Sequence, residues 1–519
     1  MKLKPDMNSN IILICVVIYF LGLLYIAYRT SKNADNQSFF IGNRKSKWWL
    51  VAFGMIGTSL SGVTFISVPG TVGKLTGTEY VYGGFEYYMM VIGFFLGYFI
   101  VAFILLPLYY KMNLTSIYTY LGRRFNLEAH KTGSIFFIIS RGIGATARLF
   151  LVINVLQIFL LDQIGIPFWL TTLIILLMIV LYTYEGGVKT IVVTDMLQTT
   201  FMLLSLVVCI VYVLTQLDMT ASEGYAKLAE YNYTHLMNFD GNSATYFLKT
   251  LVGGMFITIA MTGLDQEMMQ KNISVDNLYN SKKNMLTFAS TLLIVNFAFL
   301  FLGGLLYLYA MQNGAVYGEG SFGFKNGAGE IQNIMGDDIF PALSLQGFFP
   351  LFIAVIFIIG LISALFPSAD GALTSLTSSF CVDLLKMNEN NELSEKQKKK
   401  TRITVHLIFT LIFFLLILIF KWINDKSIVY LIMNVAGYTY GPLLGLFAFG
   451  ILTKRKISLK FAILSVALIA PVVTYTINEL FINYTDYRIG VELIVLNGLL
   501  TFTGLWIVSN KNSQKEESF

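Results

Sequence analysis

The segment from Leu351 to Phe380 carries the residues best suited to bind a cation. It is apolar at first, then becomes rich in hydroxyl side chains, and it contains one acid, Asp370. A carboxylate and several hydroxyl groups at membrane depth are costly unless they meet a partner, so they indicate a binding site. Pro367 has no backbone N–H, so the carbonyl of Ser363 loses its helical donor and can turn toward a cation. We expect this segment to form one wall of a cation site.

A second acid, Asp195, lies near the start of another apolar segment, residues 189–216. One interpretation is structural, because negative charge is favourable at the N-terminus of a helix, where Asp195 would act as a cap. The other pairs Asp195 with the hydroxyl groups of residues 351–380 as a second cation site. The sequence leaves both interpretations open.

Two arginines, Arg141 and Arg148, are seven residues apart on one face of the segment 129–161. Arg148 would be costly facing lipid, so we expect it to face the interior. There it either pairs with an internal acid such as Glu86 or clamps a substrate carboxylate, which the planar guanidinium suits. Arg141 has the further option of extending to the aqueous interface. Glu86, in an aromatic setting, is a candidate substrate contact.

The composition identifies an integral membrane protein. Of the 519 residues, 56% are hydrophobic and only 13% are charged, whereas soluble proteins carry about 25% charge. The apolar runs have the length of roughly 20 residues that a helix needs to span a bilayer, which excludes a β-barrel. No nucleophile–base pair, metal cluster or phosphate-binding loop stands out in the sequence, so we do not expect an enzyme.

We predict an all-helical protein with about thirteen transmembrane spans. Their expected bounds are 9–29, 48–72, 80–108, 129–161, 167–186, 189–216, 244–266, 283–312, 346–382, 402–422, 428–452, 459–480 and 490–509. Lys and Arg residues concentrate on alternate loops, which the positive-inside rule assigns to the cytoplasm. The N-terminus is then outside the cell and the C-terminus is cytoplasmic. The loops 217–243 and 313–345 become extracellular caps.

Two of the predicted spans contain clusters of glycine and hydroxyl residues at mid-depth. The first cluster, in span 48–72, includes Gly57, Ser61 and Thr64, and the second follows five spans later, in 244–266. Small residues at these positions either allow close helix packing or mark broken helices whose carbonyls face a cavity. Because the two clusters occupy corresponding positions in two halves, they favour an inverted-repeat transporter.

Short motifs along the chain resemble those of the sodium/solute symporter family, which includes sodium-coupled transporters of sialic acid, galactose, proline, iodide and vitamins. These motifs are Ser38–Arg44 followed by Trp48–Trp49, Gly186–Gly187 with Thr194–Asp195 and Gln198, Asp265–Gln266 with Gln270–Lys271, the segment ending at Asp383, and Gly441–Phe447. They run in the family's order through the chain, so they are jointly specific.

The resemblance implies a LeuT-type fold, in which two inverted repeats of five helices form the core. Residues 38–456 then form this core, residues 1–37 add an N-terminal helix, and residues 457–519 add two helices and a short cytoplasmic tail. It also implies sodium-driven symport across the plasma membrane by a protein that functions as a monomer. Its partners would be a small solute and the lipid bilayer, not nucleic acid.

The family's shared sodium site maps onto four positions of this chain: Gly57, Leu60, Ala364 and Ser368. A hydroxyl that the family usually supplies falls on Pro367, so one ligand is lost here. A further sodium site, known in sialic acid transporters, maps onto Asp195 and onto the positions of Asp370 and Gly371, where hydroxyls are usual. Asp370 would add a charge there and bind sodium, a proton or an arginine.

For the solute, Ser61 and Thr64 resemble the hydroxyls that hold the sialic acid carboxylate, and Arg141 or Arg148 resembles the family's substrate arginine. Only Glu86 matches the hexose contacts, so the resemblance favours a small organic anion such as sialic acid or another carboxylate. A sodium-coupled sugar or amino-acid symporter is the alternative. A transporter-like membrane sensor is a distant one, and a channel is disfavoured because no repeated charged ring is present.

Overall fold

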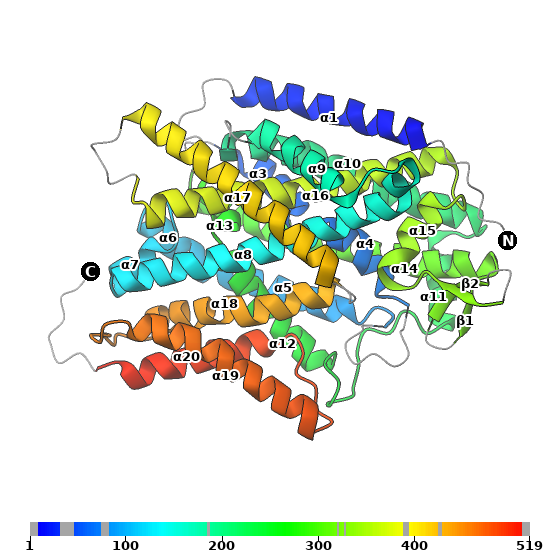
Figure 1. Ribbon diagram of the computed structural model, residues 1–519. Coiled ribbons are helices and arrows are strands. Elements are labelled where there is room, and N and C mark those ends of the chain that lie inside the picture. The colour runs from blue at the N-terminus through cyan, green and yellow to red at the C-terminus, as the bar shows by residue number, and fades with distance from the viewer. Residues whose placement is uncertain are drawn as a thin grey trace.

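The computed structural model describes residues 9–31, 46–73, 83–183, 187–318, 321–325, 329–387, 394–423 and 428–510. The motif Ser38–Arg44 and Gly186 lie outside these residues. The described chain forms a bundle of long helices that run broadly along one direction (Figure 1).

The helices, with the π-helical and 3-10 turns that join them, and the three strands have the following bounds: α1 (Ser9–Ser31), α3 (Trp48–Ser59), α4 (Gly62–Gly70), α5 (Tyr87–Ile100), η2 (Val101–Leu105), α6 (Leu106–Lys111), α7 (Thr119–Arg124), α8 (Leu127–Leu156), η3 (Gln157–Leu161), η4 (Asp162–Ile164), α9 (Phe168–Thr183), α10 (Gly187–Gln216), α11 (Ala221–Glu230), α12 (Phe247–Thr258), η5 (Ile259–Gly263), α13 (Gln266–Ile273), α14 (Leu278–Gln312), β1 (Val316–Gly318), β2 (Ser321–Lys325), β3 (Ile331–Asn333), η6 (Gly336–Asp338), α15 (Ile339–Leu345), α16 (Leu351–Ser379), η7 (Phe380–Leu384), α17 (Glu395–Ile423), α18 (Ile428–Leu452), α19 (Ala462–Tyr484) and α20 (Leu493–Val508).

Within the described residues, nine helices are long and apolar enough to cross a membrane. Two bent helix pairs, α3 with α4 and α12–η5 with α13, bring this to as many as eleven if each pair is one span. Two shorter apolar helices, α9 and α20, complete the set. Each of the predicted spans coincides with one of these elements, and the prediction of a multi-span helical membrane fold is confirmed. The protein is mostly rather than entirely helical, because residues 316–333 contribute three short strands.

The first break separates α3 from α4 by a bend of 55°. Leu60 (φ −86°, ψ 80°) and Ser61 (φ −79°, ψ 179°) leave the helical region there. The small residues on either side allow this departure, because they place little side-chain bulk against neighbouring helices. The broken span that the glycine and hydroxyl cluster indicated is therefore present.

The second break, of 63°, corrects the predicted end of span 244–266. The helical path does not end at Asp265. Instead Asp265 caps a further helix, α13, and its carboxylate accepts hydrogen bonds from the backbone N–H groups of Glu267 (2.9 Å) and Met268 (3.2 Å). All eight residues of α13 are buried despite their polar sequence. The second broken helix thus places charged side chains in the protein centre.

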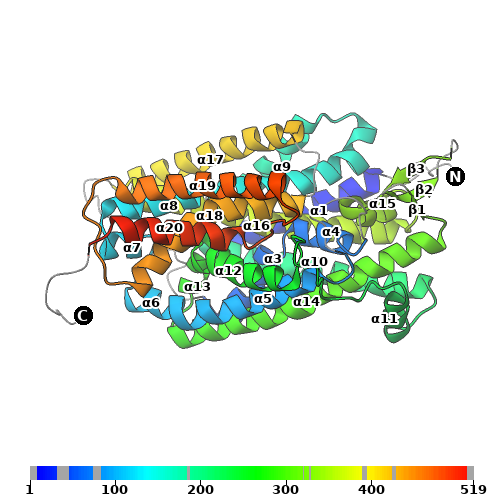
Figure 2. The same ribbon diagram turned by 90° about the horizontal axis from the view of Figure 1, so that it is seen from below.

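The centre of the bundle is formed by α16 and the four helices that pack against it, α3, α8, α10 and α13. The N-terminal helix α1 lies on the outside of α10 and α16 (Figure 1), and the hydroxyl groups of Tyr19 and Ser363 join it to α16 at 2.7 Å. On another side α19 and α20 pack against α18, as Figure 2 shows from below. These outer helices cover the central ones without taking part in either break.

Aromatic side chains fill the core between α4, α14, α15 and α16. The ring of Phe65 lies 5.7 Å from that of Phe299, 5.3 Å from Phe340 and 5.7 Å from Phe357, measured between centroids. Such tilted and offset ring pairs add packing energy beyond the area that they bury. They fix α4, the second half of the first broken helix, against its neighbours.

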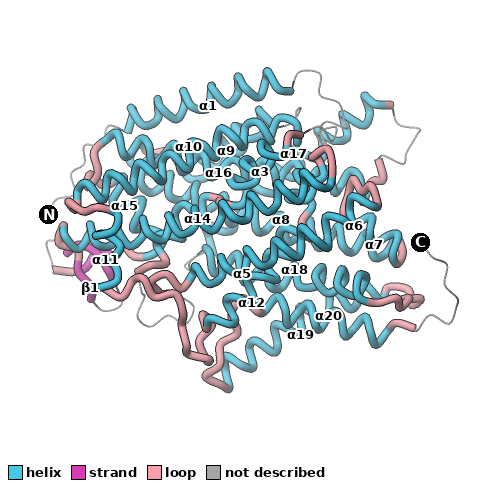
Figure 3. Tube along the Cα trace, turned by 180° about the vertical axis from the view of Figure 1, so that it is seen from behind, coloured by secondary structure: helices cyan, strands magenta, loops and turns pink. Residues whose placement is uncertain are grey.

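One end of the bundle carries a small folded cap made of α11, α15 and an antiparallel sheet of order β1-β2-β3. The segments 217–243 and 313–345, predicted as caps, contribute these elements. The start of α1 lies at the same end of the bundle, whereas the end of α20 lies at the opposite end (Figures 1 and 3).

Candidate functional site

The first helix break leaves two carbonyl oxygens without hydrogen bonds. Within the described part of the chain no donor reaches the carbonyls of Gly57 and Leu60, although the Leu60 N–H itself bonds to the carbonyl of Ile56 at 2.7 Å. Both residues are buried. Unpaired carbonyls inside a membrane protein are tolerated where they line a cavity or meet a cation.

The carbonyls at the second break, by contrast, are paired with protein groups. The hydroxyl of Tyr109 donates to the carbonyl of Gly263 at 2.8 Å, and that of Tyr118 donates to Leu264 at 3.0 Å. The two breaks are therefore chemically different. Among the residues that the structure describes, Gly57 and Leu60 at the first break offer free backbone oxygens to a ligand, whereas the carbonyls of Gly263 and Leu264 at the second do not.

Gly57 brings the first break against α10 and α16. A β-carbon built at Gly57 would overlap the hydroxyl oxygen of Thr199 and would lie 3.5 Å from Cγ of Pro367. The Thr199 hydroxyl is buried and has no hydrogen-bond partner among the described residues. Sequence reasoning did not select Thr199 as a ligand, although it follows the Thr194–Asp195 motif by one helical turn. Thr199 and Pro367 thus both border Gly57, and Pro367 is the position where the resemblance leads one to expect a hydroxyl.

On α16 the predicted residues Ala364 and Ser368 are fully buried in the same region. The hydroxyl of Ser368 donates to the carbonyl of Leu365 at 3.0 Å, which leaves its lone pairs free to accept a cation. The helix stays continuous through Pro367. Pro367 has no N–H to donate to the carbonyl of Ser363. That carbonyl is therefore a further oxygen on the α16 side of the proposed cation site.

Asp195 is not a helix cap, which corrects one of the two interpretations of this residue. The helix α10 begins at Gly187, so Asp195 lies about two turns inside it. Its carboxylate accepts a hydrogen bond from the ammonium of Lys271 at 2.7 Å and one from the hydroxyl of Thr58 at 3.3 Å. All three side chains are buried. Lys271, known from the sequence only as part of a motif, is therefore a member of the site.

Asp370 lies on α16, and its Oδ2 accepts a hydrogen bond from the hydroxyl of Tyr182 at 2.8 Å. Its Oδ1 has no hydrogen-bond partner in the part of the chain that the structure describes. The next residue, Gly371, lies against Glu267 of α13, because a β-carbon at 371 would overlap the Glu267 carboxylate. The pairing of Asp370 with an arginine, one of the three expected partners, is not found among the described residues. A tyrosine takes that place.

Arg141 and Arg148 differ in their bonding. Arg141 donates to the carboxylate of Glu267, a buried salt bridge between α8 and α13. It therefore does not extend to the aqueous interface. Arg148 makes no hydrogen bond or ion pair within the described part of the chain, and Glu86 is not its partner. Glu86 instead accepts from the Gly83 N–H (3.3 Å) and contacts Nε2 of His235 (3.1 Å).

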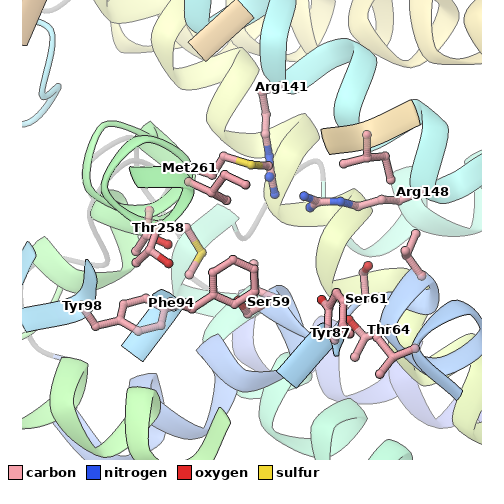
Figure 4. A pocket seen from close by; sticks show the side chains of 17 residues that line it. Ser59, Ser61, Thr64, Tyr87, Phe94, Tyr98, Arg141, Arg148, Thr258 and Met261 are labelled. Atoms are coloured by element: carbon pink, nitrogen blue, oxygen red, sulfur yellow. The ribbon is translucent and has the colours of Figure 1, made fainter. Parts of the chain in front are cut away.

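A cavity of about 110 Å³ lies at the level of both breaks and brings most of the predicted substrate residues together. The guanidinium groups of Arg141 and Arg148 point into it from α8, and Ser61 and Thr64 face them from the first break (Figure 4). Its other lining residues include Thr58, Ser59, Tyr87, Phe94, Tyr98, Thr258, Met261 and Thr262. Glu86 does not line this cavity, although its neighbour Tyr87 does.

A sequence model of the sodium:solute symporter family matches residues 39–466. The chain belongs to this family. The predicted family is thus confirmed, and the protein is a multi-pass membrane transporter that uses sodium as its coupling ion, not an enzyme.

Relatives of this symporter agree with that assignment. The chain is 24% identical to the sodium/sialic acid symporter NanT of Aliivibrio fischeri, over 91% of this chain and 88% of the relative. It is 25% identical to the sodium/sialic acid symporter SiaT of Proteus mirabilis, over 83% of this chain and 82% of the relative.

A solved structure of a Na+-coupled sialic acid symporter, in a substrate-bound outward-open state, superimposes with a TM-score of 0.77. The identity is 20%, and the alignment covers 95% of this chain and 96% of the other. The predicted LeuT-type fold is confirmed by this match.

Proposed function

We propose that this symporter takes up a small organic anion, of the sialic acid or carboxylate class, together with sodium. The observation that carries the proposal is the unpaired guanidinium of Arg148 in the central cavity, opposite the hydroxyl groups of Ser61 and Thr64. Arg148 is only half-buried because its guanidinium faces the cavity. A cation held inside a membrane protein without a protein partner is costly, so a carboxylate on the solute supplies the missing charge. The names of the two relatives described above point to the same chemistry.

The sodium ion binds, in this proposal, between the first break and α16. The carbonyls of Gly57, Leu60 and Ala364 and the hydroxyl of Ser368 form its site, and the hydroxyl of Thr199 replaces the ligand that Pro367 removes. Support comes from the unpaired carbonyls and from the contact of Gly57 with both Thr199 and Pro367.

Coupling follows from the shared first break. Gly57 and Leu60 face the ion, whereas Ser61 and Thr64, within the next turn, face the solute. An ion that orders the break therefore also orders the solute hydroxyls, and by linkage each ligand raises the affinity for the other. Arg141 lines the cavity but is neutralised by Glu267, so we assign it a supporting role and give Arg148 the solute contact.

The orientation that we propose puts the end with α11, α15 and the β-sheet outside the cell. The support is the concentration of Lys and Arg in the sequence segments at the other end, where Figure 1 places α6, α7 and the start of α17. Ser222→Cys on α11 should then react with an impermeant maleimide in intact cells, and Lys396→Cys on α17 should react only after permeabilisation. The reverse pattern would contradict the orientation.

Uptake by the purified protein in proteoliposomes tests the substrate class. A sodium gradient should drive accumulation of a sialic acid or a monocarboxylate, whereas hexoses and proline should not accumulate. Arg148→Gln should abolish this uptake, and Arg123→Gln, which alters an exposed arginine outside the cavity, should leave it unchanged. Accumulation of a neutral sugar or of proline instead would favour the alternative substrate class and contradict the role of Arg148.

A further inference from the structure

A lysine side chain occupies the interior position at which Asp195 would otherwise meet a mobile cation. The ammonium of Lys271 lies 2.7 Å from Oδ2 of Asp195, 2.5 Å from the hydroxyl of Thr58 and 4.0 Å from Oε1 of Glu267. These partners come from α10, α3 and α13. The ammonium is thus surrounded by oxygen atoms on three elements, as a bound metal cation would be.

We infer that Lys271 is a resident cation that takes the place of a second sodium ion, so that this symporter binds a single sodium. A lysine ammonium is a compact point charge with three donors, and it can neutralise a carboxylate without an ion from solution. The inference rests on the proposed sodium site at the first break, and it concerns only the number of ions that bind.

The position next to Asp370 also offers less to a second sodium than the resemblance leads one to expect. On α16, Gly371 presents no hydroxyl. The space beside Gly371 is filled by the side chain of Glu267, which a β-carbon at that position would overlap. Glu267 lies four residues before Lys271 on α13. This one short helix therefore carries both the ammonium that pairs with Asp195 and the carboxylate that fills the space beside Gly371.

Burial keeps the ammonium in this position. Asp195 is completely buried and Lys271 has 2% of its surface exposed. Separating such a pair would leave two uncompensated charges in the protein interior, at a cost far above that of an exposed pair. The lysine therefore does not leave to admit a competing sodium ion.

Equilibrium binding of radioactive sodium to the purified full-length protein tests the inference without any solute. We expect one saturable ion per wild-type chain. Lys271→Met should bind two ions, because Asp195 is then free, and adding Asp195→Asn to that variant should return the count to one. Lys271→Arg, which keeps a fixed charge, should also bind one.

Two saturable ions on the wild-type chain would overturn the inference, as would a single ion on a folded Lys271→Met protein. If Lys271→Met does not fold, Asp195→Asn alone decides: a retained count of one supports the inference, and a count of zero overturns it by making Asp195 a direct sodium ligand. No bound sodium on the wild type would instead refute the proposed sodium site, so the two failures are distinguishable.

Discussion

The hydroxyl oxygen of Thr199 lies so close to Gly57 that the two helices α3 and α10 could not approach as they do if residue 57 carried a β-carbon. This contact puts an unpaired, buried oxygen next to the unpaired carbonyl of Gly57. The neighbouring residue on α16 is Pro367, which has no oxygen in its side chain. The helix α10 thus supplies, through Thr199, a side-chain oxygen that α16 lacks at Pro367.

Replacing Thr199 by Ala should therefore lower the affinity for sodium by about 10-fold, since a polar contact to a charged group contributes roughly 1.5–3 kcal/mol. The measurement is the sodium concentration that gives half-maximal uptake. Thr200→Ala is the matched control, because Thr200 is exposed and its hydroxyl bonds to the carbonyl of Met196 in its own helix. If both variants show the same sodium dependence, Thr199 is not a sodium ligand.

Ser368→Ala should weaken sodium dependence to a similar extent, roughly 10-fold, because it removes the one side-chain oxygen that the family's site retains on α16. Ser375→Ala provides a close control. Both hydroxyls are buried on α16, and each donates to the carbonyl three residues earlier at 3.0 Å, so the local cost of removing them is the same. An unchanged sodium affinity for Ser368→Ala would exclude Ser368 on α16 as a sodium ligand.

Arg148→Lys should retain the charge but lose most of the transport activity, by roughly 10-fold or more, because an ammonium cannot bind a carboxylate in the bidentate manner of a guanidinium. Since Arg148 has no partner in the described structure, its replacement should leave the melting temperature nearly unchanged. Solute uptake and thermal unfolding in detergent, measured on the same preparation, separate the two effects. Normal uptake by this variant would exclude bidentate recognition by Arg148.

Much of the fold could be predicted because its signals are local. Apolar runs of about 20 residues mark membrane helices wherever they occur, and the glycine and hydroxyl residues around Gly57 mark the first break. The helix α13 could not be found in this way. Its sequence, Gln266–Ile273, is polar and reads as a loop, and it is buried only because Asp265 caps it and its charged groups meet partners on other helices.

The site itself was only partly predictable for the same reason. Hydroxyl and charged residues inside apolar segments identified Asp195, Arg148 and Ser368 without knowledge of their neighbours. The pairing of charged side chains, in contrast, depends on how the helices pack. Lys271 lies 76 residues from Asp195 in the chain, so no spacing rule could pair them.

The salt bridge between Arg141 and Glu267 should matter for stability more than for recognition. Arg141→Gln leaves the Glu267 carboxylate buried with a weaker set of partners, and we expect a loss of about 3–5 kcal/mol in the free energy of unfolding. The double variant Arg141→Gln/Glu267→Gln removes both charges and should recover part of this loss. Thermal unfolding of the three proteins measures the coupling. Strictly additive effects would contradict a direct pair.

Gly371 should be intolerant of any side chain as long as Glu267 keeps its full length. A β-carbon at 371 would overlap the carboxylate of Glu267 and lie 3.2 Å from its Cγ. Gly371→Ala should therefore destabilise the protein by about 1–3 kcal/mol, the usual cost of overpacking a core. Adding Glu267→Asp, which shortens the acid by one methylene group and keeps its charge, should recover part of this loss.

Gly142→Ala is the matched control for Gly371→Ala, because Gly142 is buried in α8 yet has no atom within 4 Å of a β-carbon built there. Alanine is favoured over glycine inside a helix by roughly 0.5–1 kcal/mol, so this substitution should leave stability unchanged or raise it. The same thermal measurement applies to all of these variants. If Gly371→Ala behaves like Gly142→Ala, the contact between Glu267 and α16 is not close enough to close the space beside Asp195, and a second sodium ion regains room to bind.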